Sequence, residues 1–281
     1  MLRRGLILDL DNTLYSWVDA FLPSFRAMTH VLERNLSVSE DKVLDDFRDI
    51  YRLHGTVEYP RAVEELALWK DLDVTDAERI RISSLAEKVF SINYKRHLRL
   101  FPHVLEVLEW AKEEKIVVIG LSDALERWVL YRLRSLGIAR YFHGLYTWHE
   151  DPWFVGRPPV KTSIKARVQL SSSELKPNKE VVERAVSDFS LNKHHTFMVG
   201  DSLAKDVVAA KSAGVKDVWA RYGTRPSEGN VDTLRRITPW TAKERLADRN
   251  AEASMSPPTY VIDDFGELIG LIGNQKPRLF D

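Results

Sequence analysis

The chain contains no cysteine among its 281 residues, which excludes disulfides, thiol nucleophiles and cysteine-ligated zinc or iron–sulfur centres. It also lacks an excess of either charge, because 41 lysine and arginine residues balance 41 aspartates and glutamates. No global field therefore favours nucleic acid or an anionic membrane as a partner. No stretch approaches the roughly 18 consecutive apolar residues of a membrane-spanning helix. Two aspartates interrupt the N-terminal apolar run too early for a signal peptide, so we expect a cytoplasmic protein.

What is present is an ordinary globular composition, with 44% hydrophobic and 29% charged residues. The length suffices for one large or two modest domains. Short apolar runs alternate with helical patterns along much of the chain. The expected strands are residues 5–11, 116–121, 144–148, 196–200, 217–221 and 259–262. This alternation predicts an α/β fold with a Rossmann-like, doubly wound and mainly parallel sheet.

Residues 16–98 interrupt the alternation with a purely helical pattern. Apolar residues recur there at spacings of three and four, as in Phe21, Phe25 and Met28. We therefore divide the chain into an α/β core domain, residues 1–15 and 99–281, and an inserted all-helical domain, residues 16–98.

Two segments, residues 150–175 and 223–258, look irregular and are longer than most connections. Three interpretations are open for these segments: an oligomer contact, a second lid or a surface loop. A homo-oligomer is therefore an open interpretation for the protein.

Two acids lie at the end of the first expected strand. Asp9 and Asp11 are spaced two apart, so their side chains point the same way if the strand continues. Neighbouring carboxylates repel one another unless a cation or a proton lies between them. An Asx-turn followed by a helix N-cap explains the local sequence equally well. The motif gains weight from three other polar groups further along the chain.

Ser122 and Asp123 follow the second expected strand, and Lys176 precedes a helical run. A serine at a strand end can bind a phosphate oxygen, helped by the amides of the next helix, and a lysine can balance anionic charge. Each has a simpler alternative, since such a serine is often an N-cap and such a lysine often starts a solvated helix.

Gly200 and Asp201 end another expected strand, with Asp206 shortly after. Ligands of parallel sheets bind beyond the carboxyl ends of the strands, so these acids should meet Asp9 and Asp11 in one crevice. Oxygen ligands without histidine or cysteine suggest magnesium (Mg2+). Read alone, Gly-Asp-Ser is a turn, but four such groups in this order favour a site.

Together these motifs resemble those of the haloacid dehalogenase (HAD) superfamily. The matching residues are Asp9, Asp11 and Thr13 for the first motif, Ser122 for the second, Lys176 for the third, and Gly200, Asp201 and Asp206 for the fourth. The resemblance covers residues 6–222, and the helical block lies where the family carries a type 1 cap. Within the superfamily the chain looks most like small-molecule phosphatases and pyrimidine 5′-nucleotidases.

The resemblance implies a magnesium-dependent phosphomonoesterase that acts on a small phosphorylated metabolite, with a nucleoside monophosphate as one candidate. Asp9 would be the nucleophile, forming an aspartyl-phosphate, and Asp11 the general acid and base. Magnesium would be held by Asp9, Asp201 and the carbonyl of Asp11.

The resemblance also gives roles to the remaining motif residues. Ser122 and Lys176, with Asp123 beside them, would bind the phosphoryl oxygens of the substrate. Asp206 would orient Lys176 or a metal-bound water. Thr13 and Gly200 would support the site, with Thr13 fixing its turn.

Asp11 favours phosphate esters over haloacids, because the family's dehalogenases lack this second acid and a halide leaves without a proton. A phosphotransferase or mutase would use the same intermediate, and a non-catalytic protein could use the fold to bind a phosphorylated ligand. In the cap, Trp17 and His54 are candidates for selecting the substrate, although either could be structural.

Overall fold

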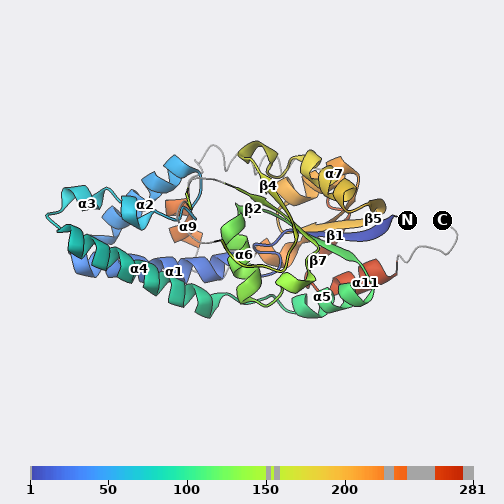
Figure 1. The fold of residues 1–281 in the computed structure, drawn as a ribbon, viewed down its shortest axis with the longest axis horizontal. Coiled ribbons are helices and arrows are strands. Elements are labelled where there is room, and N and C mark those ends of the chain that lie inside the picture. The colour runs from blue at the N-terminus through green and yellow to red at the C-terminus, as the bar shows by residue number, and fades with distance from the viewer. Residues whose placement is uncertain (1, 150–152, 155–158, 225–230, 239–256, 275–281) are drawn as a thin grey trace.

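The computed structural model describes residues 2–149, 153–154, 159–224, 231–238 and 257–274. An α/β layer and a helical unit lie end to end along its long axis (Figure 1). The strands are β1 (Arg3–Leu8), β2 (Val117–Leu125), β3 (Gly144–Trp148), β4 (Ala166–Leu170), β5 (Leu191–Gly200), β6 (Lys216–Ala220) and β7 (Tyr260–Ile262). Within the described residues they form one parallel sheet in the order β4-β3-β2-β1-β5-β6-β7, which confirms the predicted fold class.

Helices cover both faces of the sheet because the apolar side chains of its central strands point alternately to each face. Leu6 and Leu8 of β1 pack with α5 (Val104–Glu113), α6 (Glu126–Ser135) and α11 (Glu267–Gly273), whereas Ile7 packs with α7 (Lys179–Asp188) and α8 (Val208–Ala213). The buried strands therefore read as continuous apolar runs in the sequence.

The helical unit is inserted between β1 and β2, as predicted. Its helices are α1 (Trp17–Leu36), α2 (Glu40–His54), α3 (Leu68–Asp71) and α4 (Asp76–His97), with α1 and α4 side by side (Figure 1). The sequence contains the signals that begin and end these helices. Ser16 accepts a hydrogen bond from the amide of Asp19 at the start of α1, and Gly55 ends α2 with a φ of 69°. Phe25 and Phe47 join α1 to α2 with ring centroids 5.0 Å apart.

The two links between this cap and the sheet run side by side. Tyr15 and Leu100 pair as an isolated β-bridge, and the amide of Phe101 donates to the carbonyl of Leu14 at 2.9 Å. One continuous apolar core extends from the cap helices into the sheet layer. A domain division at residues 15/16 and 98/99 is our proposal.

The expectation of an irregular segment over residues 150–175 was wrong in part, because β4 pairs with β3 there at the edge of the sheet. The strand was missed because an edge strand has little apolar pattern: Arg167 and Gln169 are exposed, and only Leu170 is fully buried. Residues 150–152 and 155–158 of this segment lie outside the described residues.

The second segment, residues 223–258, contains the helix α9 (Val231–Ile237), which lies against α2 of the cap (Figure 1). Arg236 forms an ion pair with Asp41 at 2.7 Å, and Arg26 of α1 donates to Thr233 at 2.9 Å. The rest of the segment, residues 225–230 and 239–256, lies outside the described residues.

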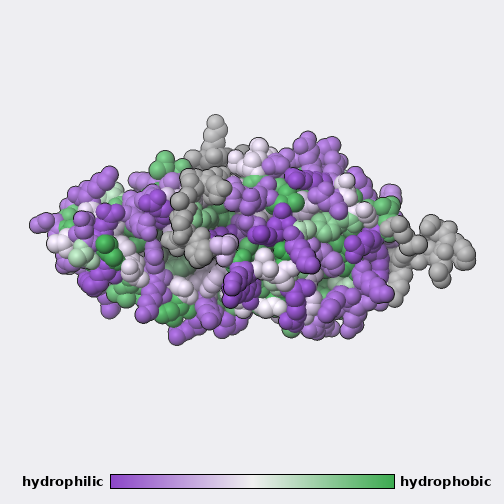
Figure 2. All heavy atoms as spheres, viewed as in Figure 1, coloured by the Kyte–Doolittle hydropathy of each residue, from purple (hydrophilic) through white to green (hydrophobic). Residues whose placement is uncertain are grey.

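Figure 2 shows a largely hydrophilic face on which hydrophobic residues form small, separate patches. In the described ranges, no helix combines the length and the apolarity that crossing a bilayer requires.

Candidate active site

The carboxyl ends of β1, β2 and β5 bring the expected polar groups together. Asp9 follows β1 directly, Ser122 lies near the end of β2, and Asp201 follows β5. The amide of Asp9 donates to the carbonyl of Val199 at 2.9 Å, which joins the ends of β1 and β5. Lys176 enters from the segment before α7. The site is thus built by the topology of the sheet rather than by residues near in sequence.

Asp9 is 5% exposed, and both of its carboxylate oxygens have partners. The hydroxyl of Thr13 donates to Oδ2 at 2.9 Å, and Nζ of Lys176 contacts Oδ1. Thr13 itself is anchored by Tyr222, whose hydroxyl donates to its carbonyl at 2.6 Å. Thr13 therefore orients the carboxylate of Asp9 directly, in addition to lying in the turn.

Lys176 is buried and placed between two acids. Its ammonium donates to Oδ1 of Asp206 at 2.7 Å and contacts Asp9 on the other side. Burial alone would lower the pKa of Lys176, but the carboxylates of Asp206, Asp9 and Asp123 outweigh it and raise the pKa well above its ordinary value. The side chain is therefore a permanent cation. Asp206 is fixed in turn by the amide of Ser202, which donates to Oδ2 at 3.0 Å.

Asp9, Asp201 and Asp206 form an acidic triad in which one carboxylate oxygen of each lies within 4.8 Å of the others. Burial first, and then the charge of Asp206, raises the pKa of Asp201 to about 7. Burial likewise raises the pKa of Asp9, with Lys176 opposing it. Three acids with a single lysine leave excess negative charge, and oxygen-only donors suit a hard divalent cation. The residues present therefore fit a magnesium ion.

The side chain of Asp11 is not part of this triad and binds Arg132 instead. Nη1 of Arg132 donates to the two Asp11 oxygens at 2.9 and 3.1 Å, and Nε donates to the hydroxyl of Tyr94 at 2.8 Å. Nη2 contacts Glu58 of the cap, which also accepts a hydrogen bond from the indole of Trp17 at 2.9 Å. A core arginine, 2% exposed, thus connects an active-site acid to two cap residues.

Sequence reasoning did not identify Arg132 or Glu58. One local signal was available, because Val129 and Leu133 place Arg132 on the inward face of α6, where a charged side chain needs a partner. That pattern predicts a buried ion pair but does not say with which residue.

Ser122 is buried, and its hydroxyl oxygen accepts a hydrogen bond from the amide of Ala124 at 3.1 Å. Asp123 accepts from the amide of Lys176 at 3.0 Å and from Nζ of Lys205 at 2.9 Å. Burial would raise the pKa of Asp123, but Lys176 and Lys205 together hold it below its ordinary value. Asp123 therefore fixes the backbone of Lys176 and joins the second motif to the third.

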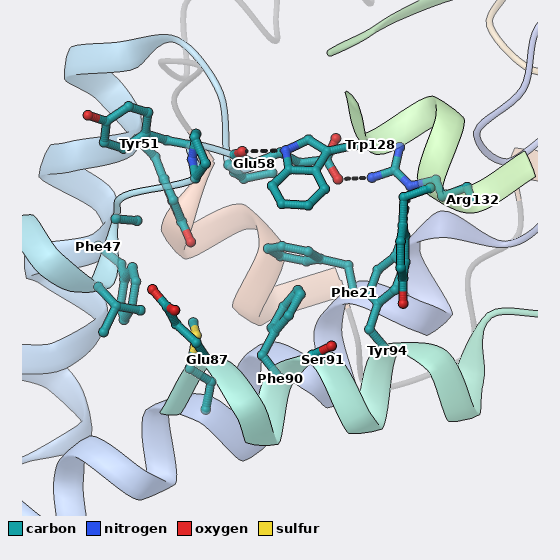
Figure 3. Close-up of a pocket in the computed structure, with 17 residues that line it drawn as sticks. Phe21, Phe47, Tyr51, Glu58, Glu87, Phe90, Ser91, Tyr94, Trp128 and Arg132 are labelled. Carbon is teal, nitrogen blue, oxygen red and sulfur yellow. Dashed lines mark hydrogen bonds and ion pairs between the residues drawn. The ribbon is translucent and has the colours of Figure 1, made fainter. Parts of the chain in front are cut away.

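The cap candidates lie near a cavity but do not line it. This cavity, about 310 Å³, lies between the cap helices and α6, with Arg132 in its wall (Figure 3). Trp17 stacks on Phe21 with centroids 4.8 Å apart, and His54 stacks on Tyr59 at 3.5 Å. A role of Trp17 and His54 in selecting the substrate stays a prediction.

Comparison with known proteins gives consistent similarities. A family model described as haloacid dehalogenase-like hydrolase matches residues 4–214, and a HAD-hydrolase-like model matches residues 175–268. Glyceraldehyde 3-phosphate phosphatase of Pyrococcus abyssi (strain GE5 / Orsay) is 38% identical over 48 residues, 17% of this chain and 20% of that protein, so the match spans a fifth of the relative. 5′-Nucleotidase YutF of Bacillus subtilis (strain 168) is 21% identical over 96% of this chain and 98% of its own. The magnesium-bound HAD-hydrolase YfnB of Bacillus subtilis shares the fold, with a TM-score of 0.52 at 16% identity over 97% of this chain and 100% of its own.

We expect Gly200→Ala to disrupt the site from within. A Cβ there would lie 2.1 Å from Cγ of Asp206, so Asp206 must move away from Lys176 and from the amide of Ser202. Misplacement of an active-site group by about 1 Å lowers the catalytic rate roughly 100-fold, so kcat should fall by about that factor. Gly270→Ala is the matched control, because nothing lies within 4 Å of its added Cβ. Steady-state kinetics of the two variants test this prediction. Equal kcat values for Gly200→Ala and Gly270→Ala would contradict this role of Gly200.

Asp123→Asn should destabilise the fold in a pH-dependent way. The folded state holds the pKa of Asp123 below that of the unfolded chain, so the carboxylate adds stability above the unfolded pKa and loses it as the pH falls through the folded pKa. We expect a loss of about 1–3 kcal/mol in the free energy of unfolding, constant from about pH 8 to 5 and shrinking below about pH 4. Denaturant unfolding across this range measures it, with Asp73→Asn at an exposed position as control. A difference that grows in acid would refute the assignment.

Proposed function

Since this chain belongs to the haloacid dehalogenase-like hydrolase family, we propose that it is a magnesium-dependent phosphomonoesterase that acts through an aspartyl-phosphate intermediate. The arrangement around Asp9 carries the proposal. Its carboxylate is oriented by Thr13, touches the ammonium of Lys176 and belongs to the triad with Asp201 and Asp206. A buried, oriented carboxylate beside a cation is what attack on an anionic phosphate requires.

In the first step, an oxygen of Asp9 forms a bond to phosphorus while the bond from phosphorus to the leaving-group oxygen breaks. Asp11 enters this step protonated, with one oxygen turned from Arg132 toward the leaving-group oxygen, and donates its proton there, so the alcohol leaves neutral. In the second step, Asp11 takes a proton from a water whose oxygen attacks phosphorus, and the bond from phosphorus to Asp9 breaks. Inorganic phosphate leaves, and both acids return to their starting states.

Lys176 and Ser122 lie where charge develops on the phosphoryl oxygens, and their donors would stabilise it. Asp9 and Asp201, with the carbonyl of Asp11, would hold the magnesium, and Asp206 adds a third carboxylate beside them. The bound ion would neutralise charge between the phosphate and the carboxylates. The donor set supports this metal because it consists of oxygen alone.

A small phosphorylated metabolite is the substrate that we propose. The full-length similarity to a 5′-nucleotidase supports a nucleoside monophosphate as a candidate. Asp11 supports ester hydrolysis over dehalogenation, since only the alcohol needs a proton. Transfer of the phosphoryl group to a second alcohol would share the first step. A cytoplasmic location is our expectation from the sequence alone.

Asp9→Asn should abolish hydrolysis while the protein stays folded. The amide has nearly the same shape but cannot attack phosphorus, so we expect a loss on the order of 10⁴-fold or more. The assay is the release of inorganic phosphate from an aryl phosphate with saturating magnesium, with circular dichroism to verify the fold. Turnover close to that of the unchanged protein would exclude the covalent mechanism.

Asp201→Ala should raise the magnesium concentration needed for half-maximal activity by at least about tenfold, because the ion loses a charged ligand. Calcium should bind but inhibit, since its larger and looser coordination would misplace Asp9. Titration with each metal tests both statements, and Asp73→Ala serves as the control. Full activity of the unchanged protein in excess chelator would contradict them.

A further inference from the structure

Aromatic side chains, contributed by both the cap and the core, are the largest group among the residues that line the 310 Å³ cavity. Phe21 comes from α1, Phe47 from α2, Phe90 from α4 and Trp128 from α6. Phe21 and Phe90 meet edge to face with centroids 5.8 Å apart, and Figure 3 shows both rings with Trp128 in the wall of the cavity. A concave, aromatic space of this size is typical of a small-ligand site.

One residue of the cavity wall, Arg132, also contacts an acid that takes part in the proposed reaction. Arg132 lines the cavity and binds both oxygens of Asp11, the acid that protonates the leaving-group oxygen in the proposed reaction. The leaving-group oxygen must approach Asp11 within hydrogen-bond distance. Because Arg132 lies between Asp11 and the cavity, the remainder of a leaving group held at Asp11 would extend past Arg132 into the cavity.

The charges in the wall restrict what that remainder can be. Among the described residues that line the cavity, Arg132 is the sole lysine or arginine, and three of its nitrogens already contact Asp11, Glu58 and Tyr94. Glu58, which lies in the same wall, shares Arg132 with Asp11, so the charge of this arginine is already divided between two acids. A second acidic group on the substrate would compete with Asp11 and Glu58 for Arg132, which is unfavourable.

We propose that the substrate is the phosphate monoester of an alcohol that carries a flat ring and no second acidic group. The inference rests on the proposed function and specifies its substrate class. A nucleoside and an arylmethyl alcohol share this chemistry, whereas phosphoglycolate and bisphosphates do not. The aromatic walls stack on the ring, and the two acids that already share Arg132, Asp11 and Glu58, disfavour a second anion.

The first test compares kcat/KM of the full-length protein with magnesium for benzyl phosphate, uridine 5′-monophosphate and phosphoglycolate. We expect at least about a tenfold preference for a ring-bearing ester over phosphoglycolate. The ester with the higher kcat/KM then shows whether the cavity prefers an arylmethyl alcohol or a nucleoside. Equal or better hydrolysis of phosphoglycolate would overturn the proposal and leave the phosphatase function intact.

Variants of the cavity wall separate recognition from folding. Phe90→Ala should raise KM for the preferred ring-bearing ester about tenfold with little change in kcat. Inhibition by inorganic phosphate, which needs core groups alone, should not change. Ile92→Ala, exposed on the same helix, is the matched control. An equal weakening of phosphate inhibition in Phe90→Ala would show that the wall is merely structural.

Glu87→Lys should lower KM for substrates that carry a second acidic group, whereas Phe90→Ala raises KM for the ring-bearing ester. A cation in the wall should lower KM for phosphoglycolate several-fold and leave that for benzyl phosphate unchanged. No change for phosphoglycolate would contradict the electrostatic part of the proposal.

If the unchanged protein hydrolyses none of these esters, the proposed function fails, and binding still tests the cavity. Calorimetric titration with benzylphosphonate and with phosphonoacetate, both with magnesium, measures recognition without turnover. Tighter binding of benzylphosphonate supports the ring-binding cavity, and equal or weaker binding overturns it.

Discussion

The buried ammonium of Lys176 is the charge on which the candidate active site at the carboxyl end of the sheet depends. Asp9 and Asp206 can be buried beside each other because this ammonium lies between them. A buried acid without such a partner would cost several kcal/mol. Other local features follow from its placement: Asp123 holds the backbone of Lys176, and the missing side chain of Gly200 leaves room for Asp206. One lysine does not neutralise three acids, and that deficit is what makes a divalent cation chemically appropriate here.

A second buried cation connects this chemistry to the cap. Arg132 belongs to the core, yet it contacts Glu58 and Tyr94 of the cap as well as Asp11. Removing one partner of a buried ion pair leaves the other charge uncompensated, so the charged side chains of Arg132, Glu58 and Asp11 are energetically coupled. Glu58 is further fixed by the indole nitrogens of Trp17 and Trp128. The position of the cap and the orientation of Asp11 are therefore set by the same contacts.

The sequence predicted the parts of the structure that are encoded locally. Buried parallel strands appear as apolar runs, and motif residues follow them, so the sheet and most of the site could be read in order. The edge strand β4 was missed because its exposed residues carry no apolar run. The pairing of Arg132 with Glu58 joins residues 74 positions apart, and periodicity within one helix cannot specify such a partner. The same holds for the cavity, since its walls come from helices that meet only in the folded chain.

In the proposed reaction, the candidate site has two halves with different physical origins. The phosphoryl half is made of charged groups at strand ends, where the regular geometry of the sheet fixes their spacing. The leaving-group half is made of aromatic rings on helices, whose arrangement depends on how the cap packs. Because Arg132 lies in both halves, a change of substrate preference through Glu58 or Tyr94 would also disturb Asp11. Residues such as Phe90, which line the cavity but do not belong to the hydrogen-bonded group of Arg132, Glu58, Tyr94 and Asp11, offer a route to altered specificity that leaves the acid in place.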